Sequence, residues 1–361
     1  FGTNFRITTW GETQGAGVGV VVDGCPAGLP LEREDVQKYL DRRKPGQSKY
    51  TTQRKEGDQV EILSGIFEGR TTGTPISMVV YNKDQRSKDY SNIKDIYRPG
   101  HADFTFDMKY GFRDYRGGGR SSGRETIGRV AAGAVAGKVL KELGIEIKAY
   151  AKAIAGIEVS KDHFDFAEMN NNPFNMPDKE AAKLVQEKAD QMIKEMDSIG
   201  GIIECQITGM PVGIGETVFD KLDAELSKAI MSIGSVKGFE IGDGFEAANL
   251  RGSENNDDFI CVDGKVEKET NHSGGVLGGM SDGSAIVFRA AIKPTPSIAQ
   301  TQKTVNRDLD NVEIEIHGRH DPMIVPRAVV VVESMAAVTI LDGVLKNLGA
   351  TMDNIKKIYG E

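Results

Sequence analysis

The chain has 361 residues, of which 45 are Lys or Arg and 53 are Asp or Glu, so its net charge is −8 and its pI about 5.4. This acidic balance argues against a general nucleic-acid binder and against a protein that binds anionic membranes. Apolar residues make up 39% and charged residues 27%, which is typical of a soluble globular protein. The three cysteines, Cys25, Cys205 and Cys261, lack the CxxC spacing of metal ligands, so we expect no metal site and a reducing, cytoplasmic setting.

The sequence predicts neither a transmembrane helix nor a signal peptide. The most apolar region, residues 324–345, is interrupted by Pro326 and by the charged residues Arg327, Glu333 and Asp342, whereas a membrane span needs about 20 predominantly apolar residues. The N-terminal residues lack a basic start followed by an apolar run, which a secretory signal requires.

Three short segments recur in the same order, which predicts an internal duplication. Residues 24–29 (GCPAGL) and 209–214 (GMPVGI) each follow a strand-like run and precede a helical one. Residues 69–76 are echoed by 279–286, and residues 139–144 by 344–349. We expect a single domain over residues 1–361 with related halves at about 1–145 and 203–349, and an inserted segment at 146–202.

Each half is predicted to contain a strand, a Gly/Pro turn, a helix, further strands and then a long helix, which indicates an α+β fold with hairpin-type sheets. The helix after Ser122 is rich in Ala and Gly, and its counterpart at residues 327–348 is apolar nearly all round, as a buried helix would be. We expect these two helices to form a central layer with sheets outside. Residues 177–198 read as a peripheral amphipathic helix.

Residues 251–272 are polar and lack a clear periodicity, so the sequence predicts a long loop there. Two interpretations stay open at this point. One is a mobile lid over a site, and the other is an ordinary surface loop.

Basic residues cluster in two islands although the chain as a whole is acidic. Residues 42–55 hold six basic residues and no acidic one, and residues 98–129 hold seven basic and four acidic residues. Arginine forks match phosphate and carboxylate groups, so these islands suit a small polyanion. A solvated basic face is the alternative for each island taken alone.

A glycine-rich segment, residues 117–125 (GGGRSSGRE), ends at a predicted helix start. Ser122 and Glu125 have the spacing of a capping box, which would place the free N–H groups of the helix beside Arg120 and Arg124. Such an arrangement suits a phosphate. The segment has no GK[ST] and is not a Walker A loop, which argues against a small-molecule kinase.

Five histidines occur, at positions 101, 163, 272, 317 and 320. His101 lies among arginines in the segment RPGHAD (residues 98–103), and His320 lies in GRHDP (318–322). Because an imidazole titrates near neutral pH, His101 is a candidate acid or base. A structural, hydrogen-bonded histidine is the alternative.

Ten segments together resemble the ordered motifs of the chorismate synthase family. They are FRITTWGETQG, DGCPAGLPL, DRRKPGQSKYTTQR, TTGTPI, RPGHAD, YRGGGRSSGRET, GDGF, NHSGGVLGG, KPTPS and GRHDP, which run from residue 5 to residue 322. The resemblance implies a β-α-β sandwich with helices between antiparallel sheets, assembled as a homotetramer. It also implies the anti 1,4-elimination of phosphate from 5-enolpyruvylshikimate 3-phosphate to give chorismate, with reduced FMN required but no net redox change.

The resemblance also implies a role for individual residues. His101 matches a histidine that protonates or hydrogen-bonds the flavin, and Asp321 an aspartate that assists proton removal. The positions that match substrate-binding residues are Arg43, Lys49, Arg98, Arg124 and Arg319. The positions that match flavin-binding residues are Arg120, Ser121, Ser122, Gly234, Ser235, Gly278, Lys293, Pro294, Thr295, Pro296, Ser297 and Arg319.

Two departures from the family pattern affect the expected chemistry. Lys49 stands where arginine is usual, so a forked contact becomes a single ammonium contact. Thr13 and Gln14, in GETQG, stand where the family has Ser and His, and a glutamine cannot act as an acid near neutral pH. Two hypotheses follow: a chorismate synthase with reduced activity, or a flavin and phosphosugar binding protein of the same family with little turnover.

No recognisable NAD(P)H domain is present in the sequence. We therefore expect NADPH to act only indirectly, through a separate flavin reductase as a partner.

Overall fold

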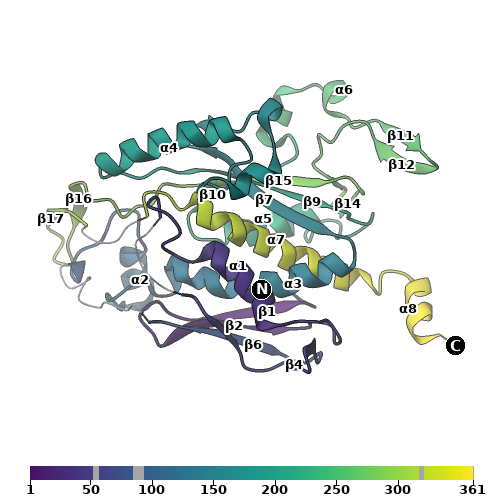
Figure 1. Ribbon diagram of the computed structural model, residues 1–361, viewed down its shortest axis with the longest axis horizontal. Coiled ribbons are helices and arrows are strands. Elements are labelled where there is room, and N and C mark those ends of the chain that lie inside the picture. The colour runs from purple at the N-terminus through teal and green to yellow at the C-terminus, as the bar shows by residue number, and fades with distance from the viewer. Residues whose placement is uncertain (52–56, 84–92, 317–320, 361) are drawn as a thin grey trace.

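Two antiparallel sheets enclose a layer of helices (Figure 1). The computed structural model describes residues 1–51, 57–83, 93–316 and 321–360. The predicted α+β sandwich with a central helix layer is confirmed by this arrangement. In Figure 1 the first sheet lies below the helices and the second lies above them.

The first sheet has the strand order β1-β2-β6-β3 and the second has the order β10-β15-β9-β7-β8. Alternate residues of each strand point to the helices, so that Val18, Val20 and Val22 of β2 are buried. The strands of the first sheet are β1 (Arg6–Gly11), β2 (Gly17–Asp23), β3 (Val60–Ile62) and β6 (Ile76–Tyr81). Those of the second are β7 (Glu146–Ile154), β8 (Ile157–Glu158), β9 (Gly201–Thr208), β10 (Val236–Ile241) and β15 (Ile286–Ile292).

Four helices occupy the space between the sheets. They are α1 (Arg33–Arg43), α3 (Thr126–Glu142), α5 (Leu222–Met231) and α7 (Val325–Asn347). Helix α7 begins with Pro326 in its first turn, where a missing N–H costs nothing. It is the one helix in the described part of the chain with the length and hydropathy of a membrane span, but 83% of that stretch is buried within the protein. It is therefore a core helix.

Helices α3 and α7 lie in direct backbone contact at Gly133. A Cβ atom added to Gly133 would lie 2.2 Å from the Cβ and 2.5 Å from the Cα of Ser334. Real Cβ atoms essentially never come this close to another heavy atom. Close packing of this kind needs a residue without a side chain, which explains the small residues of α3.

The same turn occurs in both halves of the chain. The N–H of Gly28 donates to the carbonyl of Thr71 (2.8 Å) and that of Leu29 to the Thr71 hydroxyl (3.0 Å). The N–H of Gly213 donates to the carbonyl of Ser281 (2.8 Å) and that of Ile214 to the Ser281 hydroxyl (2.9 Å). Strands β1, β2, β6 and β3 also follow the same spatial order as β7, β9, β15 and β10. These matches support the duplication.

The boundary expected at residue 146 differs from the observed arrangement. Strand β7 pairs with β9 from Glu146 opposite Thr208 to Ile154 opposite Gly201, so it belongs to the second sheet rather than to an insertion. It occupies the place that β1 has in the first sheet. The segment without a counterpart is therefore residues 155–200, which carry the amphipathic helix α4 (Lys179–Lys194) on the outer side of the second sheet.

Residues 251–272 are not a structureless loop. They form the short helix α6 (Gly252–Asn255) and a hairpin of β11 (Phe259–Val262) and β12 (Lys265–Lys268). The ammonium of Lys268 is buried and contacts Asp257 (3.2 Å) and Asp282 (2.7 Å). This buried ion pair anchors the base of the hairpin.

The remaining helices and strands of the described chain are short. They are helices α2 (Asp103–Tyr110) and α8 (Met352–Tyr359), and the strand pairs β4 (Ile66–Phe67) with β5 (Arg70–Thr71), β13 (Val276–Leu277) with β14 (Met280–Ser281), and β16 (Gln302–Val305) with β17 (Asn311–Ile314).

Gly133→Ala is expected to lower the free energy of unfolding by about 1–3 kcal/mol, because the new methyl group overlaps the backbone of α7. This cost exceeds the gain of about 0.5–1 kcal/mol that alanine brings to a helix interior. Urea unfolding measures the difference. Gly137→Ala is the matched control in the same helix, since a Cβ there meets only the hydroxyl of Tyr39, at 3.1 Å. Equal stability of the two variants would contradict the prediction.

Candidate active site

A cavity of about 1150 Å³ lies where α3 and α7 begin. It is larger than a typical pocket for one small ligand, about 300–1,000 Å³, so it has room for two. Fifteen residues that the sequence predicts for the site line this cavity. They are Gln14, Arg43, Arg98, His101, Arg120, Ser121, Ser122, Arg124, Gly234, Ser235, Lys293, Thr295, Pro296, Ser297 and Asp321.

Three predicted residues are not among the described residues that line the cavity. Lys49 pairs with Asp190 of α4 (2.8 Å) and is exposed. Gly278 lies in the tight turn between β13 and β14. Pro294 does not line the cavity, although its neighbours Lys293 and Thr295 do. Arg319, His317 and His320 lie outside the described residues.

The cavity wall is rich in positive charge. Its eight cationic side chains are Arg43, Arg98, Arg113, Arg120, Arg124, Arg129, Lys293 and Arg327, and its five carboxylates are Glu12, Asp103, Asp114, Glu125 and Asp321. The first turns of α3 and α7 add the positive ends of two helix dipoles. The cavity is therefore cationic although the chain has a net charge of −8.

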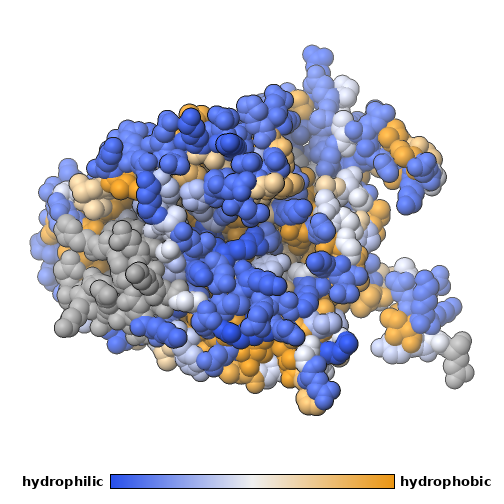
Figure 2. All heavy atoms as spheres, in the orientation of Figure 1, coloured by the Kyte–Doolittle hydropathy of each residue, from blue (hydrophilic) through white to orange (hydrophobic). Residues whose placement is uncertain are grey.

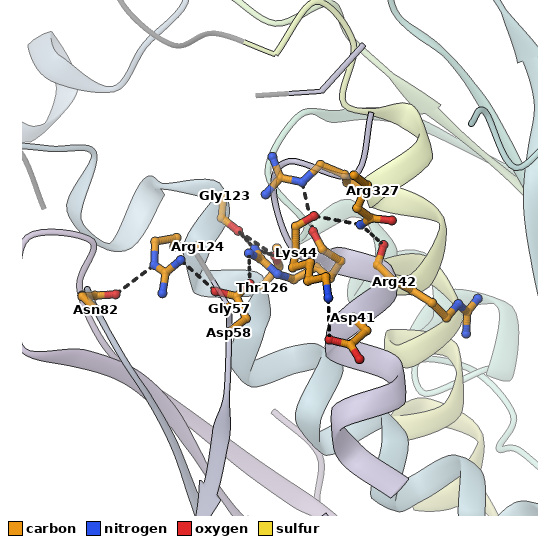
Figure 3. A network of polar contacts seen from close by, with 12 residues as sticks. Asp41, Arg42, Lys44, Gly57, Asp58, Asn82, Gly123, Arg124, Thr126 and Arg327 are labelled. Atoms are coloured by element: carbon orange, nitrogen blue, oxygen red, sulfur yellow. Dashed lines mark hydrogen bonds and ion pairs between the residues drawn. The ribbon is translucent and has the colours of Figure 1, made fainter. Parts of the chain in front are cut away.

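A buried aspartate holds two of the arginines. The carboxylate of Asp58 accepts from Arg43 (2.8 Å) and from Arg124 (3.0 Å), and its side chain is fully buried. Arg124 also donates to Asn82 (2.9 Å), as Figure 3 shows. Burial lowers the pKa of Arg43 to about 10. Burial alone would raise the pKa of Asp58, but the charges of Arg43 and Arg124 outweigh it and lower that pKa.

A second set of ion pairs places Arg98. The carboxylate of Asp103 accepts from the backbone N–H of Arg98 (3.1 Å), from its Nε (2.7 Å) and from a terminal nitrogen (2.8 Å). One turn further along α2, Asp107 accepts from Arg113 (3.0 Å) and Arg307 (2.7 Å). These contacts fix both ends of the segment that carries His101.

His101 is held in one orientation by two hydrogen bonds. Its Nδ1 lies 2.9 Å from the carbonyl of Pro99 and its Nε2 lies 2.8 Å from the hydroxyl of Ser297. Because a carbonyl only accepts, Nδ1 carries the proton and Nε2 accepts from Ser297. Burial, and then the charge of Arg98, lower the pKa of His101 to about 4. The imidazole is therefore neutral at neutral pH.

The segment that carries His101 is also locked against residues 293–297. Gly100 has a φ of +70°, and a Cβ there would lie 2.7 Å from the Cβ of Pro296. The ammonium of Lys293 donates to the carbonyl of Gly100 (3.0 Å). Position 100 thus needs glycine for both its backbone conformation and its packing.

Gln14 packs against the glycine-rich segment. A Cβ on Gly117 would lie 2.6 Å from the Oε1 of Gln14, and that oxygen is buried with no hydrogen-bond partner among the described residues. Ion pairing with Arg116 lowers the pKa of Asp114 to about 2, and the Gln14 amide adds to this effect. An anionic carboxylate beside the side chain orients the amide N–H₂ toward itself.

The glycine-rich segment differs from its predicted capping box. The Ser122 hydroxyl accepts from the N–H of Arg124 (3.3 Å) and caps a short 3₁₀ turn, residues 123–125, before α3 begins at Thr126. The Glu125 carboxylate instead accepts from Thr9 (3.0 Å) and Arg129 (2.9 Å). The glycines of this segment nonetheless line the cavity.

Sequence reasoning missed several residues that shape the site. Asp58 lies outside the quoted motifs, and only its burial between two arginines reveals its role. Arg113 and Arg129 lie within the predicted basic island but had no assigned role. The sequence analysis treated Arg327 only as an interruption of an apolar region. In the structure it lies in the first turn of α7 and donates to Asp321 (2.8 Å).

The chain is similar to known proteins over nearly its whole length. The sequence model of chorismate synthase matches residues 5–345. The chorismate synthases of Lachnospira eligens and Agathobacter rectalis are 67% and 65% identical over 359 residues, which cover 99% of this chain and 98% of each relative. That of Methanococcoides burtonii is 56% identical over 350 residues, 96% of both chains. A crystal structure of chorismate synthase has a TM-score of 0.78 and 31% identity, covering 99% of this chain and 96% of that one.

The chain belongs to the chorismate synthase family. The predicted family is thus confirmed by a match that covers nearly the whole chain. Within this chorismate synthase fold, the duplicated halves each provide one of the two helices that begin at the cavity.

Asp58→Asn is expected to destabilise the fold by about 3–5 kcal/mol at neutral pH, because it leaves Arg43 and Arg124 buried with less compensating charge. The folded-state pKa of Asp58 is lowered, so its stabilising effect is present above its unfolded pKa and is lost as the pH falls through its folded pKa. Unfolding curves at pH 7 and pH 3 measure the loss of stability in the variant and how that loss depends on pH. The control is Asp23→Asn, which breaks an exposed pair with Arg6 and should cost no more than about 1 kcal/mol. Similar losses in both variants would contradict the prediction.

His101 is expected to stay neutral at pH 5.5 in the folded protein, because its pKa is lowered to about 4. The unfolded chain binds this proton more readily, so stability falls as the pH drops from about 6.5 toward 4. Nitrogen chemical shifts of the imidazole measure its titration. Arg98→Gln, which removes a nearby positive charge, should raise the pKa of His101. Protonation of His101 near pH 6.5 in the unchanged protein would contradict this assignment.

Proposed function

We propose that this protein converts 5-enolpyruvylshikimate 3-phosphate to chorismate and inorganic phosphate. The observation that carries the proposal is the cationic cavity at two helix N-termini, which Arg43, Arg98 and Arg124 line. The substrate bears one phosphate and two carboxylates. A site with fixed cations and helix N-termini favours such a polyanion.

The proposed reaction breaks one carbon–oxygen bond and one carbon–hydrogen bond of the substrate ring. Phosphate leaves with the electrons of the carbon–oxygen bond, a proton leaves the ring, and a second ring double bond forms. The arginines and the helix N-termini stabilise the negative charge that grows on the departing phosphate. Their positions are fixed in advance by Asp58 and Asp103, so little reorganisation is needed.

The residues of the cavity also fit reduced FMN, the cofactor that the family resemblance implies. The hydroxyl of Thr295 is buried without a hydrogen-bond partner among the described residues, and Phe106 and Tyr110 add aromatic surface to the wall. When bound, reduced FMN supplies transient electron transfer to a reaction with no net redox change. The residues that would hold it are Arg120, Ser121, Ser122, Gly234, Ser235, Lys293, Thr295, Pro296 and Ser297.

His101 and Asp321 are the candidate groups for proton transfer. His101 is neutral and its Nε2 already accepts from the Ser297 hydroxyl, so a proton reaches this imidazole only through that hydroxyl or in its place. Asp321 accepts from Arg327, which holds its carboxylate at the cavity wall. We propose that these two residues receive or relay the proton that leaves the substrate.

Gln14 takes the place of the family's histidine as a hydrogen-bond donor only. Its amide can bind a phosphate oxygen, but it has no proton to give near neutral pH. Phosphate departure in this protein therefore relies on the surrounding cations. We propose a chorismate synthase of reduced activity.

We further propose that the active protein is a cytosolic homotetramer that receives reduced FMN from a separate, NADPH-dependent flavin reductase. This proposal rests on the family resemblance.

The lid interpretation of residues 251–272 gains no support from the single chain. The residues of the hairpin β11–β12 are not among the described residues that line the cavity.

Phosphate release under anaerobic conditions tests the proposed function directly. With 5-enolpyruvylshikimate 3-phosphate and reduced FMN in excess, phosphate and chorismate should form in equal amounts, and no ATP should be needed. Oxidised FMN is the control and should support no turnover. Tight binding of both molecules without phosphate release would favour the alternative, a flavin and phosphosugar binding protein.

Gln14→His is expected to raise the turnover rate by about 10²- to 10⁴-fold, the usual contribution of a positioned acid. Substrate affinity should change much less, since the amide and the imidazole both donate a hydrogen bond. Single-turnover kinetics with saturating reduced FMN separate the two effects. Thr13→Ser is the matched control, because it restores the other family residue without a titratable group. An unchanged rate in Gln14→His would show that this position supplies no acid here.

A further inference from the structure

The C-terminal helix α8 stands away from the body of the protein. It follows α7 after a connection of residues 348–351, and Figure 1 shows it projecting beyond the sheets. None of its residues is buried. Helix α8 also lies beyond residues 5–345, the part that the chorismate synthase sequence model matches.

One face of α8 is apolar and uncovered. Met352, Ile355, Ile358 and Tyr359 are spaced for one side of a helix, and all four are exposed, with Tyr359 at 85%. Figure 2 shows hydrophobic residues bare on this arm. An isolated helix shorter than about 12 residues is marginal in water. Packing of its apolar face against another surface would therefore stabilise helix α8.

A surface with matching features lies at the end of α7. Val218 and Phe219 are exposed there, Phe219 at 88%. Glu216 and Asp220 line a small cleft with Asn347, the last residue of α7. Neither carboxylate has an ion-pair partner among the described residues. We name residues 212–220 the acidic loop.

The charges of α8 complement those of the acidic loop. Lys356 and Lys357 lie in the last turn of α8, and no ion-pair partner for either occurs in the part of the chain that the structure describes. Two lysines on the arm thus match Glu216 and Asp220 on the loop, beside apolar side chains on both surfaces. Charge and apolar matching together specify one partner better than either alone.

We propose that α8 docks on the acidic loop of a second copy of this chain, with each copy giving its helix to the other. The connection from α7 to α8 begins beside the cleft of its own chain, since Asn347 lines that cleft. A twofold axis near this point therefore makes the exchange reciprocal. A single eight-residue helix covers less than the roughly 800 Å² per partner of a stable interface, so two exchanged arms with the surfaces between them are needed.

The inference concerns assembly and is independent of the reaction proposed above. Its first test is a pair of cysteines, Phe219→Cys and Ile358→Cys, in a Cys261→Ser background that removes the exposed native thiol. Mild oxidation should give covalent dimers on a non-reducing gel, and neither single cysteine variant should give this product at the same yield. A monomer with an internal disulfide, or no disulfide at all, would overturn the proposal.

A charge exchange tests the same contact without cysteines. Lys356→Glu with Lys357→Glu should at least halve the mass of the assembly measured by light scattering at low protein concentration. Adding Glu216→Lys and Asp220→Lys should restore it. The control reverses two exposed lysines of α4, Lys179 and Lys183, and should leave the mass unchanged. An unchanged mass in the α8 variant, or a failure of the restoring pair, would contradict the proposal.

Discussion

The close contact of α3 with α7 is the constraint on which the rest of the structure depends. Gly133 lets the two helices touch at their backbones, and both helices begin at the same cavity. Side chains of ordinary size at this contact would separate the helices and the two sheets that pack on them. They would also separate the two N-termini, whose partial positive charges act together only over short distances. The packing of a few small residues in the core therefore decides whether one anion can meet both helices.

Buried aspartates hold the arginines of the site in fixed positions. Asp58, Asp103 and Asp107 each bind two arginines or one arginine in a forked arrangement, and all three carboxylates are buried. A buried charge without a partner is costly, so these aspartates make it possible to keep the arginines in place before a ligand arrives. They do not cancel the field, because the cavity wall keeps more cations than carboxylates. The excess is available to a polyanionic substrate.

Much of the fold and of the site could be predicted from the sequence, for identifiable reasons. The long apolar helix, the small residues of α3 and the repeated Gly-Pro turns are local patterns, and the structure confirms the layers they predict. Strand β7 was assigned to the inserted segment 146–202 because the repeated segments of the first half end before it, and only its pairing with β9 reveals its place. Asp58 could not be found because its function depends on two arginines that are distant in sequence. Lys49 was placed by its motif, but its partner is Asp190 of α4, on a segment that has no counterpart in the first half.

The substitution at position 14 changes how this site can handle protons. His101 is the one imidazole among the described residues that line the cavity, and burial with its hydrogen bonds keeps it neutral with its lone pair at Nε2. Gln14 does not titrate, and its oxygen is enclosed against Gly117. The described wall therefore offers hydrogen-bond acceptors together with cationic arginines and a lysine. If the site releases phosphate as we propose, the departing phosphate is stabilised as an anion rather than by protonation, mainly by the electrostatic field of α3, α7 and the arginines.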